Sequence, residues 1–308
     1  MNTLSLSFAG YQGPKSIHTK AAIVFGDGLK NRHAGPVDFE LEPDVLSKGY
    51  KSGDLLGLVE RNEFTMCYIS SIRFSKVVSA FKMFELPFLI QDRQKIYAAL
   101  DGALGDHLKN LMEAATPYRV LGFWDNGFRH LTNSVRPIRT PADCQGLRLR
   151  IQMSDFLIEA FKPFGFDPVT MDIKDFIDQL GDDSAGAVNA HENPLTNIAN
   201  FKIHKHQKYL TLSGHILGVA MMLCNKDVYH AWPADFRAAV DAAATEASHA
   251  QRKFAIAEDE TALSTFDPAT VDVIHLSVDE RKAFEAAAAP LVDVYRDEIG
   301  AELFQYIR

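Results

Sequence analysis

The chain has 308 residues, a formal net charge of -8, 47% hydrophobic residues and 23% charged residues. This composition excludes a disordered chain and argues against a general binder of nucleic-acid backbone, which would need a basic surface. The longest apolar run, residues 216–224, is about half as long as a membrane-spanning helix, so we expect a buried strand there. The length suits two medium domains, each with its own core.

Strand and helix patterns alternate in the first part of the chain. Residues 4–8 alternate leucine or phenylalanine with serine, the period-two pattern of a strand, and residues 17–29 follow with helical spacing. The same order returns in residues 37–42 and 52–60, and a third strand is expected in residues 64–70. This order predicts an α/β fold with a mainly parallel sheet covered by helices.

Later segments continue this organisation. Residues 92–115 are expected to form two helical pieces broken near Gly105, followed by a strand at residues 118–124. Residues 233–265 start with a proline and then show no helix breaker for about eight turns. The pattern predicts a helix long enough to cross two domains.

The common catalytic and metal signatures are absent. There is no GxGxxG, GxxxxGK[ST], GxSxG or HExxH motif. The best metal candidates are His191 with Glu192 and His204 with His206. Adjacent residues of an extended segment point to opposite faces, and an HxH pair is common by chance, so we predict no metal. No other cofactor is expected.

Positive charge gathers in residues 127–151 of this acidic chain. The segment has one acid and five arginines, which are Arg129, Arg136, Arg139, Arg148 and Arg150. On the strand expected at residues 147–151, Arg148 and Arg150 share one face, and apolar residues share the other. Both faces of a parallel sheet are usually covered, so we expect at least one of these guanidinium groups to be buried.

A buried arginine needs an anionic partner, because desolvation of an unpaired charge is costly. For Arg136, Arg139 and Arg148, a surface position or a structural salt bridge is favoured. For Arg150, the residues alone leave two partners equally open. One is an acid of the protein, and the other is a ligand carboxylate held bidentately by the planar guanidinium.

Three blocks in a fixed order resemble a known family. They are WDNGFRHLTNSVRPIRTPADCQGLRLRI at residues 124–151, ENPLTN at 192–197 and KYLTLSGH at 208–215. They resemble the extracytoplasmic solute-binding subunits of TRAP transporters, the DctP-like family, and the resemblance covers nearly the whole chain. Any one block would be a weak signal, whereas their combination is specific.

The resemblance implies a two-lobed periplasmic solute-binding (clamshell) α/β fold with a long interdomain helix. Residues 1–125 and 216–254 would form lobe I. Residues 126–215 and 255–308 would form lobe II. The unbroken segment 233–265 fits the long helix that joins the lobes.

Carried over position by position, the resemblance makes Arg150 the main carboxylate-binding residue. Arg129 would be a second arginine of the pocket, and Asn193 would be an amide that orients the same carboxylate. The expected pocket wall consists of Tyr11, Gln12, Tyr68, Ser70, Ser71, Trp124, Asn126, Ile173 and His215. Its aromatic residues could stack on a ligand or belong to the core. A neutral analogue would leave buried arginines unpaired, so we expect its rejection.

The chain departs from the family pattern at several positions. Asn189 and His191 replace an acid and a glutamine before ENP, and the segment 181–186 is longer than the common pattern. Sialic-acid-binding members have an aromatic residue where this chain has Ile173. A ligand of the sialic-acid type is therefore not favoured, while the arginine site is unaffected.

The resemblance implies a periplasmic receptor that captures a small organic acid and delivers it to the membrane permease subunits of a TRAP transporter. It would act without turnover or nucleic acid, as a monomer, with its signal peptide removed from this sequence. The residues alone also allow a two-lobed enzyme for a small carboxylate, with His191, Glu192 or His215 as acid or base, or an effector-sensing domain. A small monocarboxylate, hydroxylated or aromatic, is favoured over a dicarboxylate.

Overall fold

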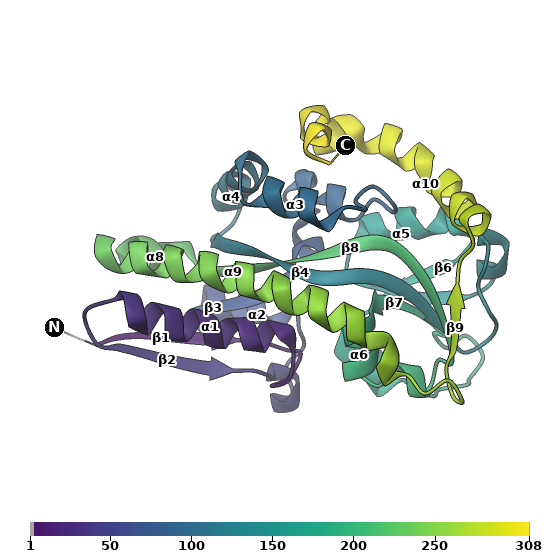
Figure 1. Cartoon of the computed structure of the whole chain (residues 1–308), viewed down its shortest axis with the longest axis horizontal. Helices are drawn as coiled ribbons and strands as arrows, with labels where there is room; N and C mark the ends of the chain where they lie inside the picture. The colour runs from purple at the N-terminus through teal and green to yellow at the C-terminus, as the bar shows by residue number, and fades with distance from the viewer. Residues whose placement is uncertain (1–2, 308) are drawn as a thin grey trace. The chain divides into compact units, whose positions relative to one another are not determined.

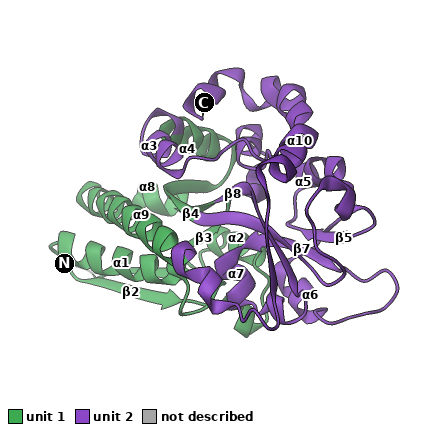
Figure 2. Cartoon of the chain, turned by 45° about the vertical axis from the view of Figure 1, so that its right-hand side comes forward, with its two compact units in different colours: residues 1–70, 105–125, 219–258 green, residues 71–104, 126–218, 259–308 purple. Residues whose placement is uncertain are grey.

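The computed structural model describes residues 3–307, which form two compact units (Figure 2). Unit 1 consists of residues 1–70, 105–125 and 219–258, and unit 2 consists of residues 71–104, 126–218 and 259–308. The strands β4 and β8 and the helix α9 each contribute residues to both units. The chain therefore passes between the units along regular elements rather than along flexible linkers.

Unit 1 is built on a sheet in which β1 pairs in parallel with β2 and β3, and β3 pairs antiparallel with β8. Its strands are β1 (Leu4–Ala9), β2 (Val37–Glu42), β3 (Met66–Ser70) and parts of β4 (Tyr118–Asn133) and β8 (Tyr209–Asn225). Its helices are α1 (Ile17–Arg32), η1 (Val45–Lys48), α2 (Asp54–Glu60), most of α4 (Ala103–Ala115), α8 (Lys226–Ala231) and most of α9 (Ala234–Ala262) (Figure 1).

The core of unit 1 shows why α1 lies on the sheet. The Ser16 hydroxyl accepts a hydrogen bond from the Thr19 amide at 3.1 Å and so caps the start of the helix. Phe25 of α1 packs on Phe39 of β2, with 5.7 Å between ring centroids. A Cβ atom at Gly26 would come within 2.3 Å of the Phe39 ring, so this close approach of helix and sheet requires glycine.

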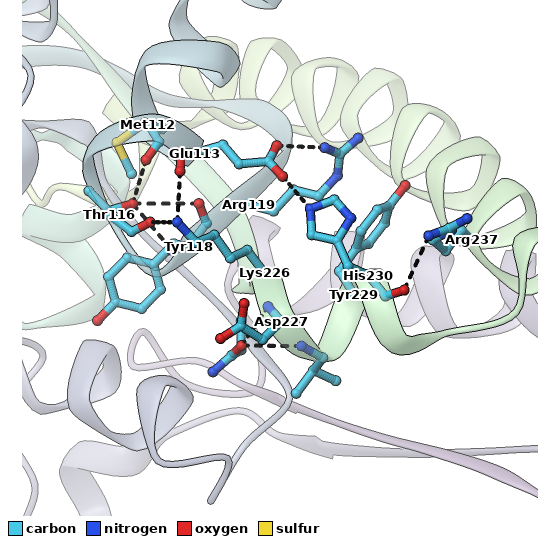
Figure 3. A network of polar contacts seen from close by, with 12 residues as sticks. Met112, Glu113, Thr116, Tyr118, Arg119, Lys226, Asp227, Tyr229, His230 and Arg237 are labelled. Atoms are coloured by element: carbon cyan, nitrogen blue, oxygen red, sulfur yellow. Dashed lines mark hydrogen bonds and ion pairs between the residues drawn. The ribbon is translucent and has the colours of Figure 1, made fainter.

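A polar network fixes the junction of α4, β4 and α8 within unit 1 (Figure 3). The Lys226 ammonium donates to the carbonyl oxygens of Glu113 and Thr116 at 2.9 and 2.8 Å, at the C-terminal end of α4. The Glu113 carboxylate in turn accepts from Arg119 at 2.7 Å and contacts His230 at 2.5 Å. Lys226 thereby satisfies carbonyls that the helix leaves without partners.

Unit 2 contains strands in the order β8-β4-β7-β5-β6, with β9 beside β8. The strands not yet given are β5 (Arg148–Ile151), β6 (Asp167–Thr170), β7 (Ala190–Pro194) and β9 (Asp272–His275). The helices are α3 (Arg93–Leu100), α5 (Asp155–Phe161), α6 (Ile173–Asp178), α7 (Leu195–Asn200) and α10 (Val278–Ile299). Short 3₁₀ helices are η2 (Ser71–Phe74), η3 (Ser79–Phe84), η4 (Pro141–Cys144), η5 (Lys162–Phe164), η6 (Ile203–Lys205), η7 (Leu263–Thr265) and η8 (Ala301–Tyr306).

The units differ from the expected lobes chiefly in residues 71–104, which were expected in lobe I and belong to unit 2. The Ser79 hydroxyl donates to the backbone oxygen of Glu298 at 2.8 Å, and Lys82 forms an ion pair with the same residue. The Ser154 hydroxyl donates to the buried carboxyl of Glu85 at 2.6 Å. These partners are distant in sequence, so local patterns do not reveal them.

Most expected elements are present, with shifts at their ends. The two expected helical pieces are α3 and α4, and the break between them falls at residues 101–102, a few residues before Gly105, which lies inside α4. Strand β4 has 16 residues and extends well past the expected end at residue 124. The expected long helix is α9, with 29 residues. Within residues 3–307, no helix has the length and apolarity needed to cross a membrane.

Candidate functional site

Strand β5 directs its two arginines into different environments. Arg148 is partly exposed and pairs with Asp167 at 3.1 Å, whereas Arg150 is only 3% exposed. The Arg150 Nε donates to the Met171 backbone oxygen at 2.8 Å, and the guanidinium lies 6.0 Å from the centre of the Phe176 ring. Its terminal amino groups have no hydrogen-bond partner among the described residues. Arg150 is therefore a buried cation with unused donors.

Arg129, on β4, is buried against Glu192 of β7. Its Nη2 donates to Glu192 Oε1 at 2.7 Å and to the Glu192 backbone oxygen at 2.9 Å, and its Nε donates to Oε2. This is the bidentate geometry in which a guanidinium binds a carboxylate most strongly. Within residues 3–307, the remaining amino group, Nη1, has no hydrogen-bond partner.

Glu192 stays ionised because of its neighbours. Burial alone would raise its pKa, but Arg129 and His215 outweigh that effect and hold the pKa at about 2. The His215 Nε2 lies 3.4 Å from the Glu192 carboxylate, and its Nδ1 lies 2.7 Å from the Ser213 hydroxyl. Burial lowers the pKa of His215 in spite of the nearby carboxylate. A carboxylate with this low pKa is a counter-ion and a poor general base at neutral pH.

The charges around Arg150 do not balance. Arg129 and Arg150 bring two positive charges and Glu192 one negative charge, and all three are at most 3% exposed. The nearby acid Asp172 is itself paired with Arg73 at 2.9 Å. Burial lowers the pKa of Arg150 to about 10, which Glu192 counteracts and Arg129 reinforces. Within the group formed by Arg129, Arg150 and Glu192, positive charge therefore exceeds negative charge by one.

Asn193 lies on β7, directly after Glu192. Its Nδ2 contacts the His191 Nε2 at 3.0 Å, and its Oδ1 accepts from the Asn197 side chain at 3.1 Å. His191 stacks on Phe176 with 4.5 Å between ring centroids, and burial together with Arg150 lowers its pKa well below 6.5. A side-chain amide has two N–H groups, so Asn193 keeps one that can bind a ligand.

The aromatic wall residues Tyr68 and Trp124 of unit 1 use their polar groups within the protein. The Tyr68 hydroxyl accepts from the backbone amides of Tyr11 and Gln12 at 3.2 and 3.0 Å. The Trp124 indole donates to the Ser248 hydroxyl at 3.2 Å. These aromatic side chains are buried and pack together in unit 1. A ligand would meet their rings rather than their polar ends.

The remaining predicted residues are also buried. Ser70 of unit 1 and Ser71 of unit 2 have hydroxyl groups without a hydrogen-bond partner in the described part of the chain. Asn126 and Ile173 are 3% and 5% exposed in unit 2. Unit 2 brings Arg129, Arg150 and His215 together around Glu192. The ligand contacts expected for the residues of both units stay predictions.

Arg136 and Arg139 have the surface roles expected for them. Arg136 Nε donates to the Asp143 backbone oxygen at 2.8 Å, and Arg139, 53% exposed at its side chain, pairs with Glu280 at 3.3 Å. With Arg148, three of the five clustered arginines therefore have structural or solvated positions. Only Arg129 and Arg150 of the cluster are buried.

Sequence reasoning missed two features that the structure shows. The first is Glu192 as the partner of Arg129, because the sequence does not show that β4 and β7 are adjacent. The second is His18 of α1, which is 1% exposed and has no hydrogen-bond partner for either ring nitrogen among residues 3–307. A histidine on the buried face of a helix gives no sequence signal that separates a ligand contact from a core position.

Two α/β units, elements that run through both, and a buried pair of arginines with a single acid partner in unit 2 are the features of a two-lobed solute-binding protein. The model of the DctP family, bacterial extracellular solute-binding protein family 7, matches residues 8–298. The chain belongs to this family, as its resemblance predicted. The family model and the named relatives are solute-binding proteins, and nothing supports the alternative of an enzyme.

Three relatives show the range of ligands. The 2,3-diketo-L-gulonate-binding periplasmic protein YiaO of Escherichia coli K12 is 30% identical over 290 residues, 93% of this chain and 86% of that protein. The C4-dicarboxylate-binding periplasmic protein DctP of Rhodobacter capsulatus is 29% identical over 306 residues, with coverages of 98% and 90%. A TRAP periplasmic solute-binding protein of Ralstonia eutropha H16, solved with bound (S)-2-acetolactate, has a TM-score of 0.87, 28% identity and coverages of 98% and 96%.

Proposed function

We propose that this protein is the periplasmic receptor of a TRAP transporter and binds a small organic acid through its carboxylate. The observation that carries the proposal is Arg150, a buried guanidinium with free donors in a cluster that lacks one negative charge. A ligand carboxylate supplies that charge and accepts hydrogen bonds from Arg150, from the free Nη1 of Arg129 and from the remaining N–H of Asn193. Glu192 holds Arg129 in place for this contact.

The ligands named for the three relatives support the proposal, because each of them carries a carboxylate. They differ in the rest of the molecule, which is a keto sugar acid, a dicarboxylate or a branched hydroxy-keto acid. The part that they share is the part that the arginines of unit 2 would bind. The receptor would act as a monomer and pass its ligand to the membrane permease.

Thermal unfolding with pairs of acids and their primary amides tests this function. The protein is first unfolded, dialysed and refolded to remove any acid acquired during expression. At a hundred times its Kd, a ligand adds about 2.7 kcal/mol to the free energy of unfolding and raises the Tm by several degrees. We expect a shift with an acid and none with its amide. Equal shifts with both, or no shift with any acid, would contradict the proposal.

A further inference from the structure

The side-chain amide of Asn193 is held between two other side chains of unit 2. Its Nδ2 lies 3.0 Å from the His191 Nε2, and its Oδ1 accepts from the Asn197 side chain at 3.1 Å. All three side chains belong to residues that are at most 5% exposed. If the amide turned over, its oxygen would face a ring nitrogen that carries no proton, and its amino group would face the amino group of Asn197. The two neighbours therefore favour one orientation of the Asn193 amide.

This orientation depends on the form of the His191 ring. An amide N–H only donates, so the His191 Nε2 accepts and the ring proton lies on Nδ1. Burial lowers the pKa of His191 well below 6.5, Arg150 and Arg129 lower it further, and Glu192 opposes these effects without reversing them. The ring is therefore neutral at pH 7. The same arginines that would bind a carboxylate thus help to keep a lone pair on Nε2 for Asn193.

Packing fixes the position of the His191 ring. The ring stacks on Phe176 of α6, with 4.5 Å between centroids and 24° between the ring planes. In the parallel pair of β5 and β7, His191 is in register with Arg150, whose guanidinium lies 6.0 Å from the centre of the same Phe176 ring. Two interactions of His191 can therefore be separated. Phenylalanine would keep the stacking without an acceptor, and glutamine would keep an acceptor without the stacking.

We propose that His191 is a positioning residue, which accepts a hydrogen bond at Nε2 and so turns the free N–H of Asn193, rather than its oxygen, toward the ligand carboxylate. The inference rests on the proposed function, in which Arg150, Arg129 and Asn193 bind that carboxylate. An amide oxygen facing a carboxylate offers it no donor, so the orientation decides whether Asn193 supports binding. The glutamine that the family pattern has in place of His191 could supply the same acceptor.

Calorimetric titration of His191 variants tests this role. The probe is the acid that binds the wild-type protein most tightly among succinate, (S)-2-acetolactate and D-erythronate, which are named as bound in solved structures of related proteins. His191→Phe removes the acceptor, so its affinity for the probe should fall about three- to tenfold. His191→Gln should bind within about twofold of the wild-type protein, as should the control His275→Phe at an exposed position of β9. Equal losses in His191→Phe and His191→Gln would overturn the inference.

A double-mutant cycle with Asn193→Ala separates positioning from a general structural effect. If His191 acts through Asn193, then His191→Phe should change the affinity by less than about twofold in the Asn193→Ala background. A three- to tenfold loss in both backgrounds would show that His191 does not act through the amide, and would overturn the inference. If Arg150→Met loses binding while Asn193→Ala binds like the wild-type protein, the carboxylate site stands and this inference fails.

A nuclear magnetic resonance measurement on the ligand-free protein tests the hydrogen bond itself. Long-range ¹H–¹⁵N spectra distinguish the two neutral forms of a histidine ring. The chain has 11 histidines, and the signals missing from His191→Gln identify those of His191. At pH 7 we expect a proton on Nδ1 and none on Nε2. A proton on Nε2 would overturn the inference. This measurement needs no ligand, so its outcome is separate from that of the proposed function.

Discussion

The substitution Arg150→Met should stabilise the ligand-free protein while it greatly weakens ligand binding. The lowering of the Arg150 pKa from its ordinary value to about 10 corresponds to roughly 3 kcal/mol of unfavourable burial of the charge, since one pKa unit equals about 1.4 kcal/mol. Methionine removes this cost and retains the apolar contact with Phe176. It also leaves the Met171 carbonyl without its donor, at a cost of about 1–2 kcal/mol. The net gain expected is about 1–2 kcal/mol.

Urea denaturation of the ligand-free protein measures this gain as an increase in the midpoint at unchanged slope. The same samples are titrated with the acid that binds the wild-type protein. Loss of a buried charge-paired partner costs 2–5 kcal/mol or more, so binding should weaken by about thirty- to several-thousandfold. The urea midpoint of Arg150→Met should therefore rise, while its affinity for the acid should fall.

Arg148→Met is the matched control on the same strand. The Arg148 side chain is 37% exposed and its partner Asp167 is 63% exposed, so this ion pair contributes at most about 1 kcal/mol. The control should bind the acid normally and should not be stabilised. The reasoning is refuted if Arg150→Met destabilises the protein by more than about 1 kcal/mol, or if it still binds the acid with wild-type affinity.

Glu192→Gln leaves Arg129 buried without its counter-ion and should destabilise the protein by about 3–5 kcal/mol at pH 7 in urea denaturation. Because the folded-state pKa of Glu192 is about 2, the difference in free energy of unfolding between the wild-type protein and Glu192→Gln should reach its full size above about pH 4.5 and shrink as the pH falls toward 2. A difference that does not change with pH would contradict the role of Glu192 as the counter-ion of Arg129. Burial raises the pKa of Glu85 to about 7, so the free energy of unfolding of the wild-type protein should fall as the pH rises from 4.5 through 7. Glu85→Gln can still accept the hydrogen bond from Ser154, and its free energy of unfolding should depend less on pH over this range. Lys226→Met should lower the free energy of unfolding by about 1.5–3 kcal/mol through lost caps on α4, and an unchanged urea midpoint would exclude that role.

Local patterns predicted most elements because their causes are local. Alternation of apolar residues and serine fixed the face of β1, and the absence of helix breakers predicted α9. The alternation of Arg148 and Arg150 with apolar residues placed both guanidinium groups on one face of β5. Which of the two arginines is buried depends on the elements that cover that face, so only the tertiary structure could show that it is Arg150.

Features that depend on partners distant in sequence could not be predicted. Residues 71–104 belong to unit 2 through contacts with Ser154 and Glu298, and no local pattern records such contacts. The role of Glu192 follows from the pairing of β4 with β7. His18 became notable only when the structure showed that nothing bonds to its nitrogens. The family resemblance pointed to Arg129, Arg150 and Asn193, whereas the excess of positive charge over Glu192 became visible only from the burial of the two arginines.

The most direct test of the central claim is a crystal structure of the protein with a bound acid that raises its Tm. The account predicts that the ligand carboxylate contacts the terminal amino groups of Arg150 and the free Nη1 of Arg129, within hydrogen-bonding distance of Asn193. A carboxylate bound elsewhere, with Arg150 contacting only solvent or inorganic anions, would contradict it.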